Sequence, residues 1–253
     1  MIEPLPYTHI VISDAHLPHD QAQRSILLQQ FLATLRPAPR TLIIAGDLFD
    51  FWVGNRPGLW RRHRKVIDRL TQLVAAGTRV IYLEGNHDFN LPFAKLGIKV
   101  YSGPIDLQLD GIPLHIAHGD LIDTDDIGYR ALYRLSRSPL IKVADGLLPD
   151  SIVFGITNRL TDHRTANRKP CSPDLWEKFA GYAREIVADR GARMVILGHA
   201  HRAALTRIAT DVGQALLVNA GDWISNATFI GLHNETVELV QYPTGERLAV
   251  ETI

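Results

Sequence analysis

The stretch HIVISDAH at residues 9–16 joins a short apolar run to two side chains that bind metal ions well, Asp14 and His16. Short, β-branched apolar runs that end at turn residues are typical of buried strands. Because side chains at positions i and i+2 of an extended chain point to one side, Asp14 and His16 are expected to face a common site. The same arrangement of apolar run and polar motif recurs in TLIIAGD (41–47), RVIYLEGNHD (79–88), PLHIAHGD (113–120) and MVILGHAH (194–201).

The periodicity between these runs predicts an α/β fold. Apolar residues recur at helical spacing over 21–35 and 59–76. Strands that alternate with helices favour a largely parallel sheet, with ligands at the carboxyl ends of the strands. Asp110-Gly111 between two apolar runs predicts a hairpin. Residues from about 124 to 190 show helical patterns without strands, so we expect one domain over 1–253 with a helical insertion at about 124–190.

Composition excludes several classes of protein. The chain has 253 residues, 46% of them hydrophobic, with 27 basic and 27 acidic side chains. This balance is typical of a globular protein, and it gives no electrostatic argument for a nucleic-acid partner. Cys171 is the single cysteine, which rules out an intramolecular disulfide and a cysteine-built metal site. Without a signal peptide or a run of about 20 apolar residues, we expect a cytoplasmic protein.

Each polar motif has an ordinary structural interpretation when it is taken alone. A single Asp-x-His, Gly-Asp or Gly-Asn-His is most often a cap, a turn or a hydrogen-bonded structural feature. Five such motifs in one order, each just after an apolar run, favour a shared metal site instead. Carboxylate, amide and imidazole ligands without thiolate suit Mn²⁺, Fe, Zn²⁺ or Mg²⁺.

In this order the motifs D-x-H, G-D, G-N-H-D, H and G-H-x-H resemble those of the calcineurin-like metallophosphoesterases. The resemblance implies a four-layer α/β/β/α sandwich that holds two divalent metal ions, of which we expect Mn²⁺. Two ions clamp the attacking and leaving oxygens of a displacement at phosphorus and make a bound water acidic, so that hydroxide attacks. The resemblance implies that one ion is held by Asp14, His16, Asp47 and His201, and the other by Asp47, Asn86, His118 and His199.

The resemblance also implies that His87 is a catalytic residue beside the bridging Asp47. In the family, the equivalent histidine faces the substrate and donates a proton or a hydrogen bond to the phosphoryl group, and Asp88 could orient it. A structural histidine is the alternative. Asp50 could support a site histidine or cap the turn that follows it.

The segments ISDAHL, AGDLFDFWVG, EGNHDF and AHGDLIDTDDIGY resemble the UDP-2,3-diacylglucosamine pyrophosphohydrolases of lipid A synthesis. This implies hydrolysis of the pyrophosphate bond to UMP and 2,3-diacylglucosamine 1-phosphate, with a helical cap that holds the acyl chains. The apolar side chains of residues 140–160 suit such a cap, or only pack its helices together. His87 replaces an arginine of the best-known members, and Lys169 lies one position away from the cap lysine. The implied substrate-binding residues are Asn86, His87, Asp126, His163, Asn167, Lys169 and His199.

Other functions stay open at this point. One alternative is a phosphodiesterase or phosphatase of soluble nucleotides or phosphoproteins, and another is a non-catalytic scaffold on the same fold, which would be expected to lose metal ligands. The basic stretch WRRHRK (60–65) suits contact with anionic headgroups at the inner membrane surface, or a solvated helix face. We expect a lipid nucleotide-sugar substrate, peripheral membrane contact and no nucleic acid.

Overall fold

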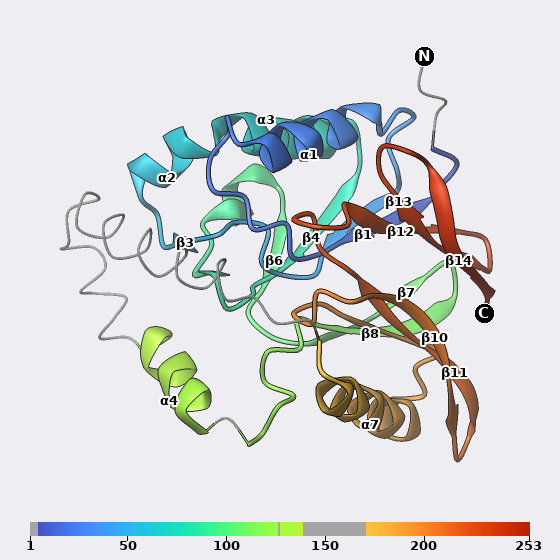
Figure 1. Ribbon diagram of the computed structural model, residues 1–253. Coiled ribbons are helices and arrows are strands. Elements are labelled where there is room, and N and C mark those ends of the chain that lie inside the picture. Colours follow the sequence, from blue (N-terminus) through green and yellow to red (C-terminus); the bar gives the residue numbers. More distant parts are fainter. Residues whose placement is uncertain (1–4, 126, 139–170) are drawn as a thin grey trace.

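Two β-sheets lie face to face in the computed structural model, which describes residues 5–125, 127–138 and 171–253 (Figure 1). The seven-stranded sheet has the order β14 (Glu246–Thr252), β13 (Thr236–Gln241), β12 (Thr228–His233), β1 (His9–Ile12), β2 (Thr41–Ile44), β4 (Arg79–Leu83) and β6 (Lys99–Tyr101). The five-stranded sheet has the order β10 (Ala203–Thr210), β11 (Gly213–Ala220), β9 (Met194–Leu197), β8 (Ile112–Ala117) and β7 (Ile105–Leu109). β3 (Trp52–Val53) pairs with β5 (Asp88–Phe89) as a small third sheet.

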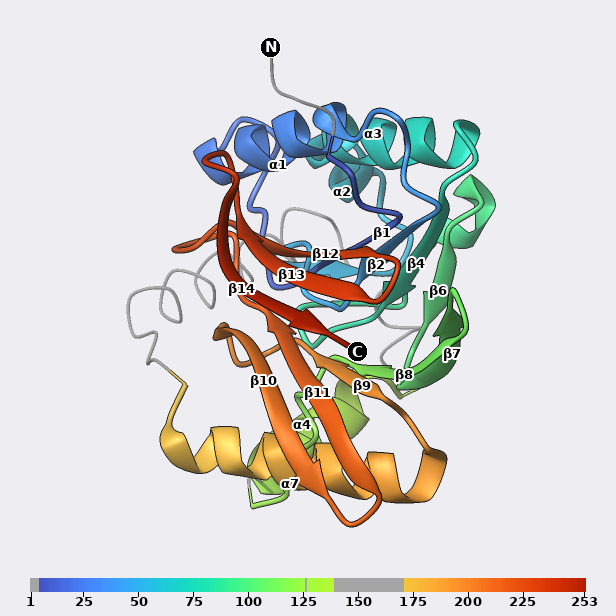
Figure 2. The ribbon, with the colours of Figure 1, turned by 90° about the vertical axis from the view of Figure 1, so that its right-hand side faces the viewer.

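Helices cover the outer face of each large sheet (Figures 1 and 2). α1 (Gln23–Thr34) and α3 (Arg64–Ala75) lie on the seven-stranded sheet, and α7 (Pro173–Arg190) lies on the five-stranded sheet. Two sheets between two helical layers form the α/β/β/α sandwich that the resemblance implied, so that expectation is confirmed.

Three apolar layers hold these elements together. On β1, Ile10 and Ile12 face α1 and α3, whereas Val11 faces the second sheet. Both faces of β1 are therefore buried, which explains why its sequence is continuously apolar instead of alternating. Phe179 of α7 lies in the third layer and packs with apolar residues on the outer face of the five-stranded sheet.

Several predicted elements are confirmed, and their pairing differs from the expectation in one respect. β4 covers the apolar run RVIYL at the start of the segment 79–88, and the hairpin β7–β8 turns at Asp110 and Gly111, which both have positive φ. The predicted parallel pairing holds for β1, β2, β4 and β6, and for β8, β9 and β11. Both sheets are nevertheless mixed, because their remaining strands join by antiparallel pairing.

The helix expected over 59–76 is divided in two. α2 (Pro57–Arg62) ends at His63, whose φ of −121° leaves the helical region, and α3 begins one residue later. The His63 ring packs against Phe49 and Trp52, and the carboxylate of Asp20 accepts a hydrogen bond of 2.7 Å from the backbone N–H of Lys65. These contacts come from distant segments, which is why periodicity alone could not locate the break.

Part of the predicted insertion is described. α4 (Ile127–Ser136) begins it, and η1 (Phe93–Leu96) is a short 3₁₀ helix elsewhere. Residues 173–190 of the expected range form α7, which belongs to the outer layer of the sandwich. Residues 139–170 and Asp126 lie outside the described residues, so the extent of the cap stays a prediction. Among the residues that the structure describes, no helix is long and apolar enough to cross a membrane.

Candidate metal centre

The polar motifs meet at one edge of the sandwich because the strands before them are parallel. Asp14, Asp47 and Asn86 follow β1, β2 and β4, and His118 and His199 follow β8 and β9. Parallel strands bring their carboxyl ends to the same edge. Two facing sheets therefore contribute side chains to one cluster, although the motifs are almost 190 residues apart in sequence.

The backbone at this edge has an unusual conformation. Five residues of the cluster have φ between 46° and 61°, a region that few residues other than glycine adopt: Asp14, His16, Asp47, His199 and His201. Each lies in the loop that follows its strand, so the extended i, i+2 geometry expected from the sequence is wrong, although Asp14 and His16 do face a common site. Strained backbone of this kind gathers at functional sites, where the surrounding fold holds it in place.

A first group of possible ligands is formed by Asp14, His16 and His201. Asp14 Oδ1 lies 3.8 Å from His16 Nε2 and 3.7 Å from His201 Nε2. Asp14 Oδ1 and His16 Nε2 are buried and lack a hydrogen-bond partner among the described residues. A buried polar atom without a partner costs about 1–3 kcal/mol. A cation between these atoms would satisfy both, so the residues fit a divalent metal ion.

A second group lies on the other side of Asp47. Asn86 Oδ1 lies 3.1 Å from both His118 Nε2 and His199 Nδ1. Asp47 Oδ2 lies 3.3 Å from His118 Nε2 and 3.7 Å from His16 Nε2, so one carboxylate oxygen reaches both groups. The structure thus brings together all seven residues of the implied ligand set and gives Asp47 the position of a bridge.

The carboxylates and histidines of the cluster shift each other's pKa values. Burial alone would raise the pKa of the Asp14 and Asp47 carboxyl groups, but the surrounding histidines hold both pKa values well below their usual range. Burial would lower the pKa of His118, whereas the Asp47 carboxylate raises it well above its usual value. Burial lowers the pKa of His199. Carboxylates that stay ionised and stabilise a protonated imidazole nearby can stabilise a metal cation in the same way.

Carboxylates and a carbonyl oxygen outside the cluster support its histidines. Asp50 Oδ1 lies 3.6 Å from His16 Nδ1, and Asp50 also accepts a hydrogen bond of 2.7 Å from Arg24 Nη2. The backbone carbonyl of Ala45 accepts a hydrogen bond of 2.9 Å from His118 Nδ1. Of the two roles left open for Asp50, the structure favours support of a site histidine. Such partners fix the ring orientation and the tautomer of a metal ligand.

Sequence reasoning missed one further supporting carboxylate and misplaced another. Asp222 Oδ2 lies 3.8 Å from His201 Nδ1, but its sequence, NAGDWIS, carries no signal of this role. The suggestion that Asp88 orients His87 is wrong. The buried Asp88 carboxylate accepts backbone hydrogen bonds of 3.1 Å from Asp47 and Gly85, and burial raises its pKa to about 7. It therefore positions the loops that carry ligands.

Two glycines allow the ligand loops to approach each other. A Cβ atom at Gly85 would lie 2.6 Å from the backbone nitrogen of Asp47 and 2.8 Å from its Cγ. A Cβ atom at Gly198 would lie 2.7 Å from the carbonyl oxygen of Ala45 and 3.0 Å from Asp14 Oδ2. Real Cβ atoms essentially never approach another atom more closely than 3.0 Å, and both glycines have backbone atoms below this limit, so the close packing requires glycine at both positions.

His87 lies directly beside the bridging carboxylate. Its backbone N–H donates a hydrogen bond of 2.8 Å to Asp47 Oδ1, and its ring stands edge-on to that of His16 at 4.7 Å. His87 Nδ1 lies 2.9 Å from the carbonyl oxygen of Asp50. A carbonyl oxygen only accepts, so Nδ1 carries the proton, and in the neutral ring Nε2 is then the acceptor nitrogen. His16, Asp47 and His87 also form a third group with metal-binding geometry.

Arg137, at the end of α4, is a contact that the sequence analysis did not find. Its Nη2 donates a hydrogen bond of 2.6 Å to the carbonyl oxygen of Gly85, in the loop that carries Asn86. The guanidinium also lies over the rings of Phe89 and Tyr133, 4.5 Å and 3.7 Å from their centroids. The Arg137 side chain thereby connects the start of the insertion to the loop that carries the proposed metal ligand Asn86. The predicted substrate contacts Asp126, His163, Asn167 and Lys169 lie outside the described residues.

Comparison with known proteins agrees with this geometry. Residues 8–203 match the family model described as calcineurin-like phosphoesterase. The chain is 31% identical over 220 residues to the UDP-2,3-diacylglucosamine hydrolase of Pseudomonas syringae pv. tomato, covering 85% of this chain and 87% of that protein. It is 27% identical over 227 residues to the enzyme of the same name from Aeromonas salmonicida, covering 87% and 88%.

A solved structure has the same fold. The phosphoesterase Yfce from E. coli superimposes with a TM-score of 0.51 at 16% identity, over 97% of this chain and 98% of that one. The family model covers most of the chain, and the strands and loops that it spans are those that bring the metal-binding side chains together. The chain therefore belongs to the calcineurin-like phosphoesterase family.

Proposed function

We propose that this protein hydrolyses the pyrophosphate bond of UDP-2,3-diacylglucosamine and releases UMP and 2,3-diacylglucosamine 1-phosphate. The observation that carries the proposal is the pair of ligand groups that share Asp47 Oδ2. The relatives named UDP-2,3-diacylglucosamine hydrolase, which match 85% of the chain, support this substrate over soluble nucleotides or phosphoproteins.

Seven residues would hold two divalent ions, and we propose Mn²⁺ as the physiological metal, with Fe, Zn²⁺ and Mg²⁺ as the other ions that suit such ligands. When bound, the ions supply a water of lowered pKa and a polarised phosphoryl group. The first ion would take Asp14, His16, Asp47 and His201. The second would take Asp47, Asn86, His118 and His199. A chain with every expected ligand type in place does not support the alternative of a scaffold without catalysis.

His87 is proposed to act on the phosphoryl group. Because Nδ1 donates to the carbonyl of Asp50, Nε2 can donate a hydrogen bond or a proton only when the ring is an imidazolium. A neutral ring would instead accept a proton at Nε2. Asn86 precedes His87 in the sequence, and the ring of His199 lies 5.4 Å from that of His118. Both Asn86 and His199 are proposed to contact the substrate as well as the metal. Asp126, His163, Asn167 and Lys169 stay proposed contacts from the cap.

Contact with the cytoplasmic face of the inner membrane is a second part of the proposal. Within the stretch 60–65, Arg62 donates to the carbonyl oxygen of Pro18 and His63 is buried, whereas Arg61, Arg64 and Lys65 are exposed. Basic side chains near an anionic leaflet contribute about 1 kcal/mol each. Cosedimentation with anionic vesicles should therefore weaken in Arg61→Glu/Lys65→Glu, and equal binding by the variant would reject this surface.

The test of the activity compares two substrates. Protein reconstituted with Mn²⁺ is assayed for release of UMP from UDP-2,3-diacylglucosamine and for hydrolysis of bis(p-nitrophenyl) phosphate, before and after treatment with EDTA. We expect turnover of the lipid substrate that EDTA abolishes and Mn²⁺ restores. Turnover of the generic ester alone would reject the lipid substrate, and activity that survives complete removal of metal would reject the metal mechanism.

A further inference from the structure

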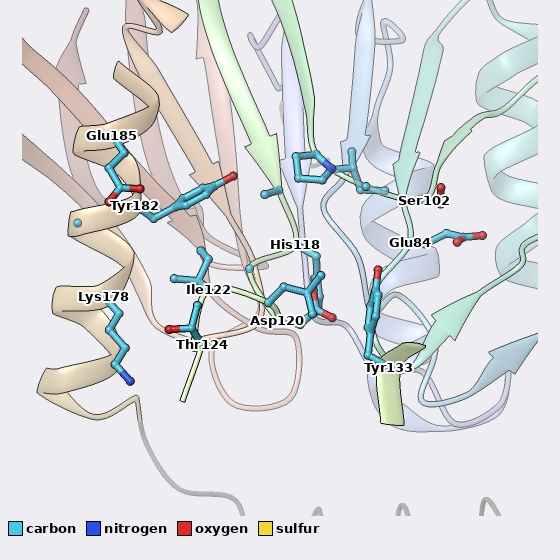
Figure 3. Close-up of a pocket in the computed structure, with 17 residues that line it drawn as sticks. Glu84, Ser102, His118, Asp120, Ile122, Thr124, Tyr133, Lys178, Tyr182 and Glu185 are labelled. Carbon is cyan, nitrogen blue, oxygen red and sulfur yellow. The ribbon is translucent and has the colours of Figure 1, made fainter. Parts of the chain in front are cut away.

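A cavity of about 580 Å³ opens beside His118, on the side of the metal centre that faces α7 (Figure 3). Its volume lies in the range of about 300–1,000 Å³ that is typical of small-molecule sites. α7, the turn between β6 and β7, α4 and the loop after β8 contribute its walls. Because His118 is both a proposed metal ligand and a wall residue, a ligand at the metals can extend directly into this cavity.

The charged groups of the cavity are mainly acidic. Asp120 and Glu185 contribute carboxylates to its walls. Glu84 also lines the cavity, but its Oε1 accepts a hydrogen bond of 2.9 Å from the backbone N–H of Leu91. Besides the proposed metal ligand His118, Lys178 is the one basic residue among the described wall residues, and its Nζ already lies 2.6 Å from both Asp123 Oδ1 and Asp125 Oδ2. A phosphate group would be repelled by such walls, whereas neutral groups with hydroxyl or N–H donors would find acceptors in them.

Tyr182 provides a further acceptor, which a buried hydrogen-bond chain holds in place. The fully buried His115 lies with Nδ1 2.6 Å from Asp106 Oδ1 and with Nε2 2.8 Å from the hydroxyl of Tyr182, and Arg190 donates to the same aspartate at 2.6 Å. The carboxylate of Asp106 accepts the proton of Nδ1, so Nε2 accepts the hydrogen bond of the Tyr182 hydroxyl. The lone pairs of that oxygen remain able to accept a hydrogen bond from a ligand donor.

The rest of the wall suits a flat, partly polar ligand. Tyr133 and Tyr182 offer aromatic rings from opposite sides of the cavity, on α4 and α7, and Ser102 and Thr124 add hydroxyl groups (Figure 3). Apolar side chains, among them Leu83, Leu121 and Ile122, make up much of the wall and suit the faces of a flat ring. An acyl chain would also gain about 0.8 kcal/mol for each buried CH₂ group there, but it would make no hydrogen bond with the hydroxyl and carboxylate groups, whereas a base and a ribose use both kinds of wall.

We infer that this cavity binds the nucleoside half of the substrate, the uracil ring and its ribose, while the phosphates lie at the metal centre. The inference rests on the proposed function and assigns to the cavity the part of the substrate that leaves as UMP. The ribose hydroxyls and the N–H of the uracil ring are the neutral donors that carboxylates and the Tyr182 oxygen would accept.

Gly181 allows the cavity to be filled without disturbing the fold. It lies on α7 in the cavity wall, and a Cβ atom there would meet nothing within 4 Å apart from its chain neighbours and the backbone of its own helix. Gly181→Phe should place a ring in the space proposed for the nucleoside, and Gly181→Ala, which adds one methyl group, is the matched control. Replacement of a helical glycine by alanine is also expected to stabilise the helix, which guards against failure to fold.

The probes are UMP, uridine and inorganic phosphate, and their binding to the Mn²⁺-loaded protein is measured by calorimetry without turnover. We expect UMP to bind the unchanged protein at least about tenfold more tightly than phosphate, because the nucleoside atoms add contacts in the cavity. In Gly181→Phe this advantage should be lost while phosphate affinity stays the same. Gly181→Ala should retain the advantage.

Two results would overturn the inference. One is equal affinity of the unchanged protein for UMP and phosphate, a measurement that needs no variant. The other is a folded Gly181→Phe protein that keeps its affinity for UMP but loses affinity for 2,3-diacylglucosamine 1-phosphate, which would assign the cavity to the acyl chains. Failure of the proposed function would appear separately, as absence of UDP-2,3-diacylglucosamine turnover in a protein that still binds UMP through the cavity.

Discussion

Gly85→Ala should remove metal from the site without removing a ligand. The added Cβ atom would lie 2.6 Å from the backbone nitrogen of Asp47, and it would be closer still to Asp47 Oδ1. Real Cβ contacts are essentially never shorter than 3.0 Å, so residue 85 and the Asp47 nitrogen must move apart by at least 0.4 Å, and residue 85 and the Asp47 carboxylate by more. Gly85 has no positive φ, so the strain comes from this overlap alone.

The expected loss of metal affinity and rate in Gly85→Ala follows from how small a displacement of a ligand a catalytic site tolerates. Catalytic groups must be held within about 0.5 Å of their productive geometry. Displacement by about 1 Å costs about 10²-fold in rate, and loss of a group that orients a ligand lowers metal affinity by about 10–100-fold. For Gly85→Ala we expect Mn²⁺ affinity to fall by about 10–100-fold and kcat/KM to fall by about 10²-fold.

The assay is calorimetric titration of the metal-free protein with Mn²⁺, combined with steady-state kinetics and a thermal melt. Gly77→Ala is the matched control, since Gly77 has a φ of +93° at the end of α3 and a Cβ atom there would meet nothing within 4 Å. Alanine in this conformation costs about 1–2 kcal/mol of stability and should leave metal binding intact. Metal affinity and kcat/KM within twofold of the unchanged protein in Gly85→Ala would refute the packing argument, whereas equal loss of metal in both variants would assign the effect to general destabilisation.

Four further predictions concern single side chains. Asp47→Ala should abolish hydrolysis and weaken both metal sites, whereas His87→Ala should keep two metal ions by elemental analysis and slow turnover by about 10²–10⁴-fold; loss of metal from His87→Ala would make His87 a ligand. Arg137→Gln should lower kcat by about tenfold or more with bound metal unchanged, because a charged hydrogen bond to the Gly85 carbonyl contributes about 1.5–3 kcal/mol. Arg137→Lys should not restore it, since an ammonium group lacks the stacked planar fork, and full activity of the lysine variant would contradict this role. Burial lowers the pKa of His63 to about 3 from its usual 6.5, so the unfolded chain binds an extra proton between these values and stability falls as pH drops. His63→Phe should reduce this slope by about 1.4 kcal/mol per pH unit in urea titrations of metal-free protein between pH 6 and pH 4, and an unchanged slope would show that His63 is not the group responsible.

The local sequence was sufficient to predict an element when the contacts that determine it involve residues close together in the chain. The run HIVI is apolar at every position because both faces of β1 are buried, and this alone marks it as a central strand. Asp110-Gly111 fits the two positive φ values of its hairpin turn. The break at His63 had no such local signal, because it depends on rings of Phe49 and Trp52 and on a hydrogen bond from Lys65 to Asp20.

The same division applies to the site. The motifs and the family that they resemble were enough to name the seven proposed ligands, since each motif follows a strand and these strands are parallel. The role of Asp222 beside His201 and that of Arg137 beside Gly85 could not be read in this way, because both contacts join segments that share no sequence pattern.

By itself the sequence determined the chemistry: which strands are buried, which polar residues leave their ends, and the ligand types that suit divalent metal ions at phosphorus. Only the tertiary structure decided the geometry, namely the left-handed turns that aim the ligands, the glycine at 85 that lets two loops touch, and the cavity between His118 and α7. The physical reason is the sequence distance over which each interaction acts. Burial and backbone preference act on neighbours in the chain, whereas the distances at a metal site are set by the packing of two sheets whose strands meet only after folding.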